Sequence, residues 1–288
     1  MKLFFNLFKL RIGIVIAITA VAGWAVTPGE AIAPWQVMVL ALSVLVSSAA
    51  AGAFNQYAER DLDARMQRTR GRPFVSGALR YGSHWLWLIG SMTLISVLAA
   101  GIALNPFAAL YVFLGAFFYA IVYTVWLKRR TWLNIVIGGL SGSFAVLAGS
   151  AAATPALSPE ALALALVLFL WTPPHFWSLA IAYREDYASA GVPMLPVVIG
   201  DASCARAIFW GTLALVIASL APALFSLGWI YLCAALAGGG YLLWTSASLL
   251  LDPTRARAMT NFHASLVQLS VVLLGAMLDP GLRAAFGA

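Results

Sequence analysis

The chain has 288 residues, of which 62% are hydrophobic and only 9% are charged, and its mean hydropathy is +0.92. A soluble domain carries roughly a quarter charged residues, so this composition excludes an ordinary globular core. We expect lipid to surround most of the chain. The residues suffice for one membrane domain, residues 1–288, and leave no polar stretch long enough for a second.

Windows of about 20 apolar residues, the length that crosses roughly 30 Å of hydrocarbon, recur along the chain. They predict nine membrane-spanning helices, at about 10–27, 35–57, 84–104, 106–126, 132–153, 160–183, 204–225, 228–251 and 261–279. The expected fold class is therefore an all-α integral membrane bundle.

The net charge of +7 would suggest nucleic acid as a partner for a soluble protein. Here the distribution of charge is explained better by membrane topology. If the N-terminus lies inside, each of the 17 basic residues except Arg283 falls in the inner segments 1–11, 58–83, 127–131, 184–206 and 252–260. Because cytoplasmic loops carry the excess of Lys and Arg, we predict a cytoplasmic N-terminus, an outer C-terminus and no nucleic-acid partner.

A polar stripe follows the second predicted span. Asn55, Glu59 and Asp63 stand at i, i+4 and i+8, so they share one face of a helical extension. Carboxylate and amide oxygens suit a hard cation such as Mg²⁺, which is commonly held together with substrate phosphates. The alternative is a solvated helix with salt bridges. Asn55 near the membrane boundary favours the functional interpretation, because polar groups are costly in lipid without a role.

Arg68 and Arg72 continue the same spacing, where guanidinium groups suit phosphate oxygens. Together with the stripe they indicate a diphosphate bridged to the protein by Mg²⁺. Taken alone, the two arginines fit a solvated helix face equally well. Lys128 and Arg129, at the end of the fourth span, are explained most simply as topology signals.

His175 follows Pro173 and Pro174 inside the sixth predicted span. The proline pair frees backbone carbonyls, which are tolerated only against protein or a wet cavity. His175 lies about two turns, roughly 12 Å, from the charged surface. A ligand role and an ordinary hydrogen-bonded core histidine both remain open. An acidic pair, Glu185 and Asp186, follows at the end of this span, so two long charged loops are expected to face each other.

These motifs resemble the UbiA-type intramembrane prenyltransferase superfamily, and within it the protohaem IX farnesyltransferase (haem O synthase) branch. The resemblance covers nearly the whole chain. It is carried by the segments 55–63, 127–139, 171–177 and 186–196, whose order and spacing together are specific to this branch.

The resemblance implies a nine-helix bundle in a bacterial inner membrane, with its active cavity toward the cytoplasm. It implies Mg²⁺-dependent transfer of a farnesyl group from farnesyl diphosphate to a vinyl group of haem B, which gives haem O and releases diphosphate. Membrane lipid and terminal-oxidase assembly proteins are the implied partners. An alternative is a quinone-precursor or other tetrapyrrole acceptor.

The resemblance also assigns roles by position. Asn55, Glu59 and Asp63 correspond to the first metal–diphosphate motif, Asp186 to a remnant of the second, and Lys128 to a catalytic residue. The expected diphosphate partners are Arg68, Arg72, Lys128 and Arg129, and His175 is the expected acceptor-binding residue.

Two positions depart from the superfamily pattern. Glu59 stands where Asp is usual, which keeps the charge on a longer side chain. Ala190 stands four residues after Asp186, where a second carboxylate is usual, and Glu185 is the candidate to supply the missing oxygen. The alternative function from another class is a transporter, in which intramembrane polar residues line a translocation path. It is disfavoured because the polar groups are confined to one side of the membrane.

Overall fold

The computed structural model describes residues 2–29 and 32–286, with side chains described for residues 3–29 and 32–282. Within these ranges the regular structure is helical. The elements are α1 Lys2–Leu7, α2 Leu10–Ala25, α3 Pro34–Ala58, α4 Arg60–Arg65, α5 His84–Ala103, α6 Pro106–Phe117, the π-helix η1 Phe118–Leu127, α7 Asn134–Gly138, α8 Leu140–Ala153, α9 Pro159–Ala182, α10 Arg184–Ser189, α11 Leu195–Ile199, α12 Asp201–Ala218, the 3₁₀ turn η2 Ala221–Leu224, α13 Trp229–Leu251 and α14 Arg255–Phe286.

The observed helices pair one to one with the predicted spans. In the described part of the chain, eight helical segments are long and apolar enough to cross a bilayer, and the 16-residue α2 is a shorter ninth. The all-α expectation is confirmed. Three spans are interrupted, however: 106–126 changes from α- to π-helix at Phe118, 132–153 divides at Gly139, and 204–225 leaves the α-helix after Ala218 and ends in the 3₁₀ turn η2.

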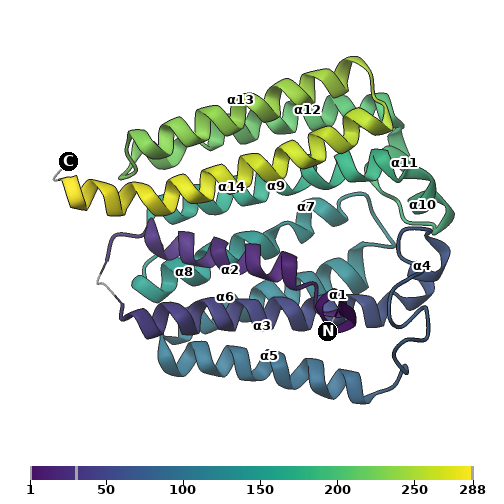
Figure 1. Cartoon of the computed structure of the whole chain (residues 1–288), viewed down its shortest axis with the longest axis horizontal. Helices are drawn as coiled ribbons and strands as arrows, with labels where there is room; N and C mark the ends of the chain where they lie inside the picture. Colours follow the sequence, from purple (N-terminus) through teal and green to yellow (C-terminus); the bar gives the residue numbers. More distant parts are fainter. Residues whose placement is uncertain (1, 30–31, 287–288) are drawn as a thin grey trace.

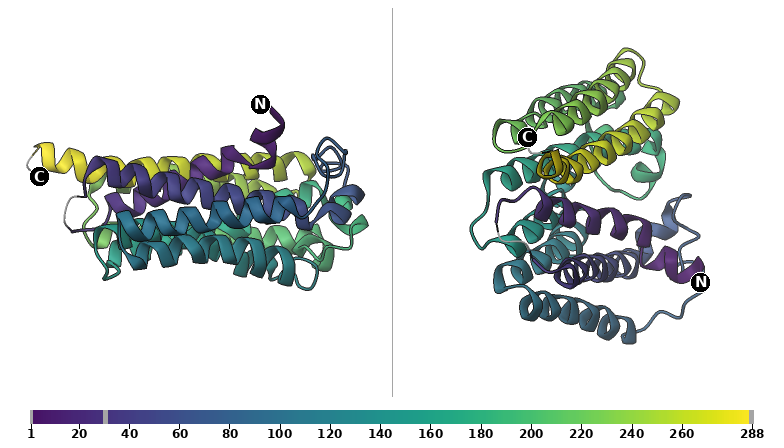
Figure 2. Two further views of the ribbon diagram at one scale, coloured as in Figure 1. Left: turned by 90° about the horizontal axis from the view of Figure 1, so that it is seen from below. Right: turned by 60° about the vertical axis from the view of Figure 1, so that its left-hand side comes forward.

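Two groups of long helices form the bundle, and the connecting segments lie at its two ends (Figures 1 and 2). One group contains α9, α12, α13 and α14, and the other contains α2, α3, α5 and α6. Helix α8 lies between the groups, packed against α2, α6 and α9. One hydrophobic core lies around Tyr231 and Leu242 and extends to Ala22 on α2, and another lies around Leu40 and Val112.

Glycines bring α2 and α8 into backbone contact. A Cβ on Gly149 would lie 1.8 Å from the carbonyl oxygen of Ala20, and one on Gly23 would lie 2.2 Å from that of Val146. Such close approach through small residues is how membrane helices maximise van der Waals contact. The contact joins the N-terminal helix to the centre of the bundle.

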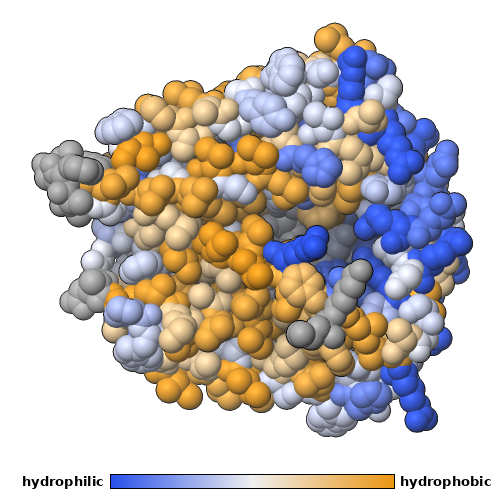
Figure 3. Space-filling model, in the orientation of Figure 1, coloured by the Kyte–Doolittle hydropathy of each residue, from blue (hydrophilic) through white to orange (hydrophobic). Residues whose placement is uncertain are grey.

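Polar residues gather at one end of the molecule, around α4 and α10, while apolar side chains cover the helices beside them (Figure 3). Trp87 and Ile102 on α5, for example, are 80% and 85% exposed. An apolar lateral surface and helices with internally satisfied backbones are what a bilayer requires. The site is built at the polar end.

Asp279 shows how the opposite end is closed. It is the last residue of the predicted span 261–279 and is fully buried inside α14, which extends well beyond that span. Its carboxylate accepts hydrogen bonds from the backbone N–H groups of Gly228 at 2.6 Å, Ile230 at 3.2 Å and Tyr231 at 3.3 Å. A carboxylate at a helix N-terminus satisfies orphan amides and favours the helix dipole.

Candidate active site

The predicted stripe keeps its register although its helix is interrupted. Helix α3 ends at Ala58 and α4 begins at Arg60, because Glu59 leaves helical geometry with φ −101° and ψ 15°. The backbone N–H of Glu59 still donates to Asn55 at 3.0 Å, and that of Asp63 still donates to Glu59 at 2.8 Å. The i, i+4, i+8 register is therefore kept, and all three side chains are at most 3% exposed.

Arg68 and Arg72 do not continue the helix, and this part of the prediction is wrong. Helix α4 ends at Arg65, where Met66 turns to an extended conformation, and the chain enters a turn-rich loop. Arg72 nevertheless returns to the stripe, where its Nη1 lies 2.8 and 2.7 Å from the two oxygens of Asp63. Arg72 reaches Asp63 because the loop turns back toward the helix, and helical spacing in the sequence does not predict this turn.

Each member of the stripe is bound by a cation from another segment. The three pairs are Lys9 Nζ with Asn55 Oδ1 at 2.7 Å, Lys128 Nζ with Glu59 Oε2 at 2.5 Å, and Arg72 Nη1 with Asp63 Oδ2 at 2.7 Å. We call these six residues the cation–carboxylate row. Three cations thus lie side by side over buried oxygen ligands, which is an arrangement suited to a multiply charged anion.

The π-helix η1 forms one wall of the row. The backbone N–H of Lys128 donates to the carbonyl of Tyr123, five residues earlier, at 2.9 Å. Tyr119 accepts from Lys9 at 2.8 Å, and Thr124 accepts from the amide of Asn55 at 3.1 Å. π-Helical turns are rare and often occur at functional sites. Here the wider turn presents two tyrosines and Lys128 to the stripe.

Lys9 is the member of the row that the sequence analysis missed. It adopts a left-handed conformation, φ 48° and ψ 42°, between α1 and α2. Such a conformation is uncommon for a residue with a side chain and clusters at functional sites. Nothing in the sequence distinguishes Lys9 from Lys2 or Arg11, because all three fit the positive-inside pattern.

The two charged loops meet at Asp186, as expected. Its carboxylate oxygens accept the backbone N–H groups of Gln67 and Arg68, both at 3.1 Å. The Arg68 guanidinium donates to the hydroxyl of Tyr187 at 3.3 Å and lies 5.4 Å from the ring of Tyr183. Asp186 therefore ties the arginine-bearing loop to α10.

Arg129 lies at the exposed rim and forms a bidentate pair with Asp61, with both distances 2.7 Å. Hydrogen bonding from Arg129 lowers the pKa of the Asp61 carboxyl below its ordinary value. The pair is about half exposed on both sides, in contrast to the buried pair of Glu59 and Lys128. Glu185, the candidate replacement for the missing second acid, is also exposed.

His175 lies apart from the row. Its ring is stacked between Trp171 at 4.1 Å and Phe262 at 4.4 Å, and its Nδ1 is 2.7 Å from the hydroxyl oxygen of Ser265. These contacts belong to α9 and α14, and the described side chains provide no hydrogen bond between His175 and the row. The hydrogen bond and ring contacts of His175 therefore involve none of the other predicted site residues.

The row can hold a divalent cation only if a bound substrate supplies some of the oxygen ligands. No group of three or more His, Cys, Asp and Glu side chains suitable for a metal occurs in the described ranges. Glu59 Oε1 is buried without a hydrogen-bond partner among the described residues, so it is an acceptor that a cation would satisfy. Mg²⁺ typically takes one or two carboxylates together with phosphate oxygens and water, which agrees with this ligand set.

The chain is similar to known proteins along nearly its whole length. Residues 16–271 match the model described as the UbiA prenyltransferase family. The chain is 56% identical to protoheme IX farnesyltransferase 2 of Paramagnetospirillum magneticum over 97% of both chains. It is 38% identical to protoheme IX farnesyltransferase of Alkalilimnicola ehrlichii over 99% of this chain and 94% of that one.

Solved structures support the same fold. A UbiA homologue from Aeropyrum pernix superposes with a TM-score of 0.78 at 21% identity, covering 94% of this chain and 98% of that one. A homologue from Archaeoglobus fulgidus bound to DMAPP and Mg²⁺ superposes with a TM-score of 0.72 at 15% identity, covering 93% and 99%.

The buried and exposed ion pairs predict very different mutational effects. Glu59→Ala leaves the Lys128 ammonium buried and unpaired, so we expect a loss of about 3–5 kcal/mol in the free energy of unfolding. Asp61→Ala removes a solvent-screened pair and should cost at most about 1 kcal/mol. Denaturant unfolding in detergent measures both. The double variant Glu59→Ala/Lys128→Met should recover most of the loss. Equal effects of the two single variants would contradict the assignment.

Proposed function

This chain belongs to the UbiA prenyltransferase family, and we propose that it transfers a farnesyl group from farnesyl diphosphate to a vinyl group of haem B, giving haem O and diphosphate. The names of its relatives support the donor and the acceptor. The observation on the molecule that carries the proposal is the cation–carboxylate row, where three cations lie over buried oxygen ligands.

The row is the proposed diphosphate site. Phosphate oxygens are strong partners for ammonium and guanidinium groups, so a diphosphate would take over Lys9, Lys128 and Arg72 from their carboxyl and amide partners. Asn55, Glu59 and Asp63 would then hold Mg²⁺ together with the diphosphate. When bound, Mg²⁺ supplies positive charge that neutralises the phosphate oxygens.

The protein's own groups assist departure of the diphosphate. As the allylic C–O bond breaks, negative charge grows on the leaving group, and preorganised cations stabilise that charge in the transition state. Arg68, held by Asp186, and Arg129 are the proposed outer partners. The rings of Tyr119 and Tyr123 are suited to stabilise the farnesyl cation by cation–π interaction.

The acceptor then forms the new carbon–carbon bond. The haem vinyl group attacks the farnesyl cation, the positive charge moves to the adjacent carbon, and addition of water there gives the hydroxyl and releases a proton. We assign His175 to the acceptor, through the haem iron or a propionate. Its Nδ1 is engaged by Ser265, so Nε2 is the nitrogen that would serve the haem. Arg255, 5.3 Å from the ring of Tyr183, is a basic group of the kind that propionates pair with.

The chain is a multi-pass membrane protein, and we propose that it lies in a bacterial inner membrane with the row toward the cytoplasm. The charge asymmetry of the loops supports this orientation. On the cytoplasmic side the product would pass to terminal-oxidase assembly partners.

The orientation can be tested with reporter fusions. A fusion after Arg72, at the charged end, should report cytoplasm, and a fusion after Thr154, in the loop between α8 and α9, should report the outside. Alkaline phosphatase and green fluorescent protein fusions give opposite signals on the two sides. Both fusions reporting one side would contradict the proposed topology.

The metal–diphosphate role predicts a large loss of activity in Asp63→Ala. The reaction is followed by mass detection of haem O from detergent-solubilised protein with haem B, farnesyl diphosphate and Mg²⁺. Removing one such electrostatic group should lower turnover by a factor on the order of 10² to 10³. Glu59→Asp should be tolerated because the carboxylate is kept. Asp252→Ala, at an exposed acid far from the row, is the control. Near-normal turnover in a folded Asp63→Ala variant would refute the role.

Substitutions of His175 distinguish effects on haem from effects on farnesyl diphosphate. In His175→Ala, the dependence of rate on farnesyl diphosphate and Mg²⁺ should stay close to wild type, while haem binding or haem turnover falls. His175→Gln, which can still hydrogen-bond, should rescue a structural role but not an iron ligand. His84→Ala, at an exposed histidine on α5, is the control. Normal haem farnesylation by His175→Ala would show an ordinary core histidine.

A further inference from the structure

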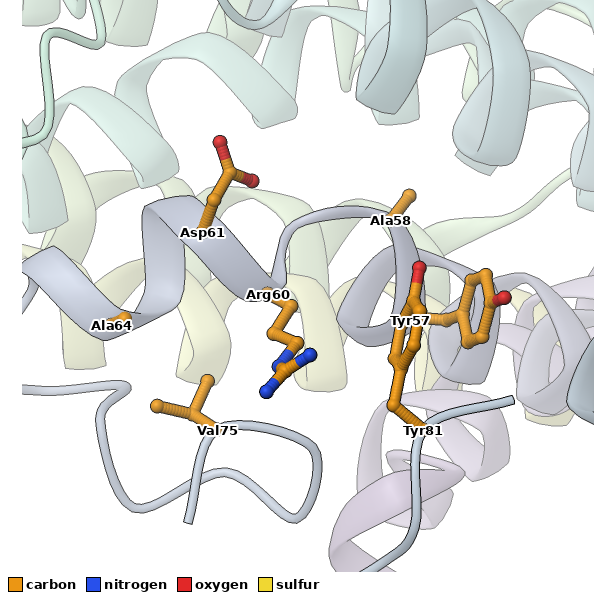
Figure 4. Close-up of a pocket in the computed structure, with 7 residues that line it drawn as sticks. All are labelled: Tyr57, Ala58, Arg60, Asp61, Ala64, Val75 and Tyr81. Carbon is orange, nitrogen blue, oxygen red and sulfur yellow. The ribbon is translucent and has the colours of Figure 1, made fainter. Parts of the chain in front are cut away.

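A cavity at the charged end of the bundle shares no residue with the cation–carboxylate row. It has a volume of about 440 Å³ and is formed where the C-terminus of α3, helix α4 and the loop before α5 come together (Figure 4). Its lining residues are Tyr57, Ala58, Arg60, Asp61, Ala64, Val75 and Tyr81. The proposed reaction does not use it.

An aromatic stack forms one side of this cavity. The Arg60 guanidinium lies 5.1 Å from the ring of Tyr81, which in turn stacks on Tyr57 at 4.3 Å with the planes 10° apart. In Figure 4 the Tyr81 ring lies between Arg60 and Tyr57. Phe74 packs edge-on against both tyrosines and against Trp85. The guanidinium is therefore supported by an ordered aromatic platform.

The cavity carries uncompensated positive charge. Both oxygens of Asp61 are engaged by Arg129, and in Figure 4 the Asp61 carboxylate points away from Arg60. Across the described residues, no carboxylate forms an ion pair with Arg60, whereas other rim arginines, Arg184 and Arg257, are paired with Asp201 and Asp252. An anion is the expected ligand.

The position of the cavity indicates the kind of anion. It lies at the charged end of the bundle, directly before the N-terminus of α5, whose outward face is apolar. Trp87, Ile95 and Ile102 on that face are 64–85% exposed. Acyl chains lying along this face would bring a headgroup phosphate to the level of Arg60 and the tyrosine hydroxyls, where arginine and aromatic residues meet the membrane interface.

We propose that this cavity binds the headgroup of an anionic phospholipid. The phosphate pairs with Arg60, the hydroxyls of Tyr57 and Tyr81 hydrogen-bond to headgroup oxygens, and the acyl chains lie along α5. The site does not depend on the identity of the prenyl acceptor, because its residues include neither His175 nor any member of the row.

Native mass spectrometry of the full chain in detergent tests the site, with phosphatidylglycerol and phosphatidylcholine as probes. Wild type should bind one phosphatidylglycerol more tightly than phosphatidylcholine. Arg60→Gln should weaken phosphatidylglycerol binding by about tenfold or more, since a charge-assisted hydrogen bond is lost. Arg70→Gln, which removes the same charge from an exposed position in the loop after α4 and outside the cavity, should leave binding unchanged. Tyr81→Ala should weaken binding, and Tyr81→Phe should weaken it less.

Three results would overturn the proposal. These are equal affinity of wild type for the two lipids, equal losses in Arg60→Gln and Arg70→Gln, and displacement of phosphatidylglycerol by millimolar inorganic phosphate, which would identify a soluble-anion site instead. If Arg60→Gln fails to fold, the lipid comparison on wild type and the two Tyr81 variants decides the question. Unchanged turnover and melting temperature in Arg60→Gln would show that its effect is confined to lipid binding.

Discussion

Charge neutralisation of a buried carboxylate stripe is the constraint on which the polar end of this molecule depends. Glu59 and Asp63 are almost completely buried at the end of a membrane helix. An unpaired buried carboxylate is strongly destabilising. Their partners come from separate segments, since Lys128 follows the π-helix and Arg72 belongs to the loop after α4. Pairing both carboxylates with these cations therefore fixes the position of η1 and of this loop relative to α3.

The same pairing prepares the row for the diphosphate that we propose it binds. A cation held against a carboxylate is desolvated and oriented before any ligand arrives, so little reorganisation is needed when a phosphate replaces the carboxylate. The freed carboxylates are then suited to a divalent cation bound with that phosphate. In the proposed function, a metal–diphosphate unit would satisfy the same side chains that the ion pairs satisfy in its absence.

The remaining contacts place the row within the bundle. Asp186 binds the backbone of Gln67 and Arg68, which joins the C-terminal helices to the loop that carries Arg72. At the other side, the glycine contacts of α2 with α8 hold the helix that follows Lys9 against the bundle centre. His175 is held by Trp171 of its own helix α9 and by Ser265 and Phe262 of α14. The two proposed substrates are thus served by different segments of the bundle.

The sequence alone determined the features that repeat along a single helix. The apolar windows specified the spans, and the four-residue spacing specified the stripe of Asn55, Glu59 and Asp63, because both depend only on local geometry. Tertiary structure decided the partners: Lys9 with Asn55, 46 residues apart, and Lys128 with Glu59, 69 residues apart. It also decided the loop reversal at Arg72 and the burial of Asp279. These contacts depend on which helices pack together and on where each helix ends, and a basic residue at a membrane boundary looks the same in sequence whether it faces solvent or a buried oxygen.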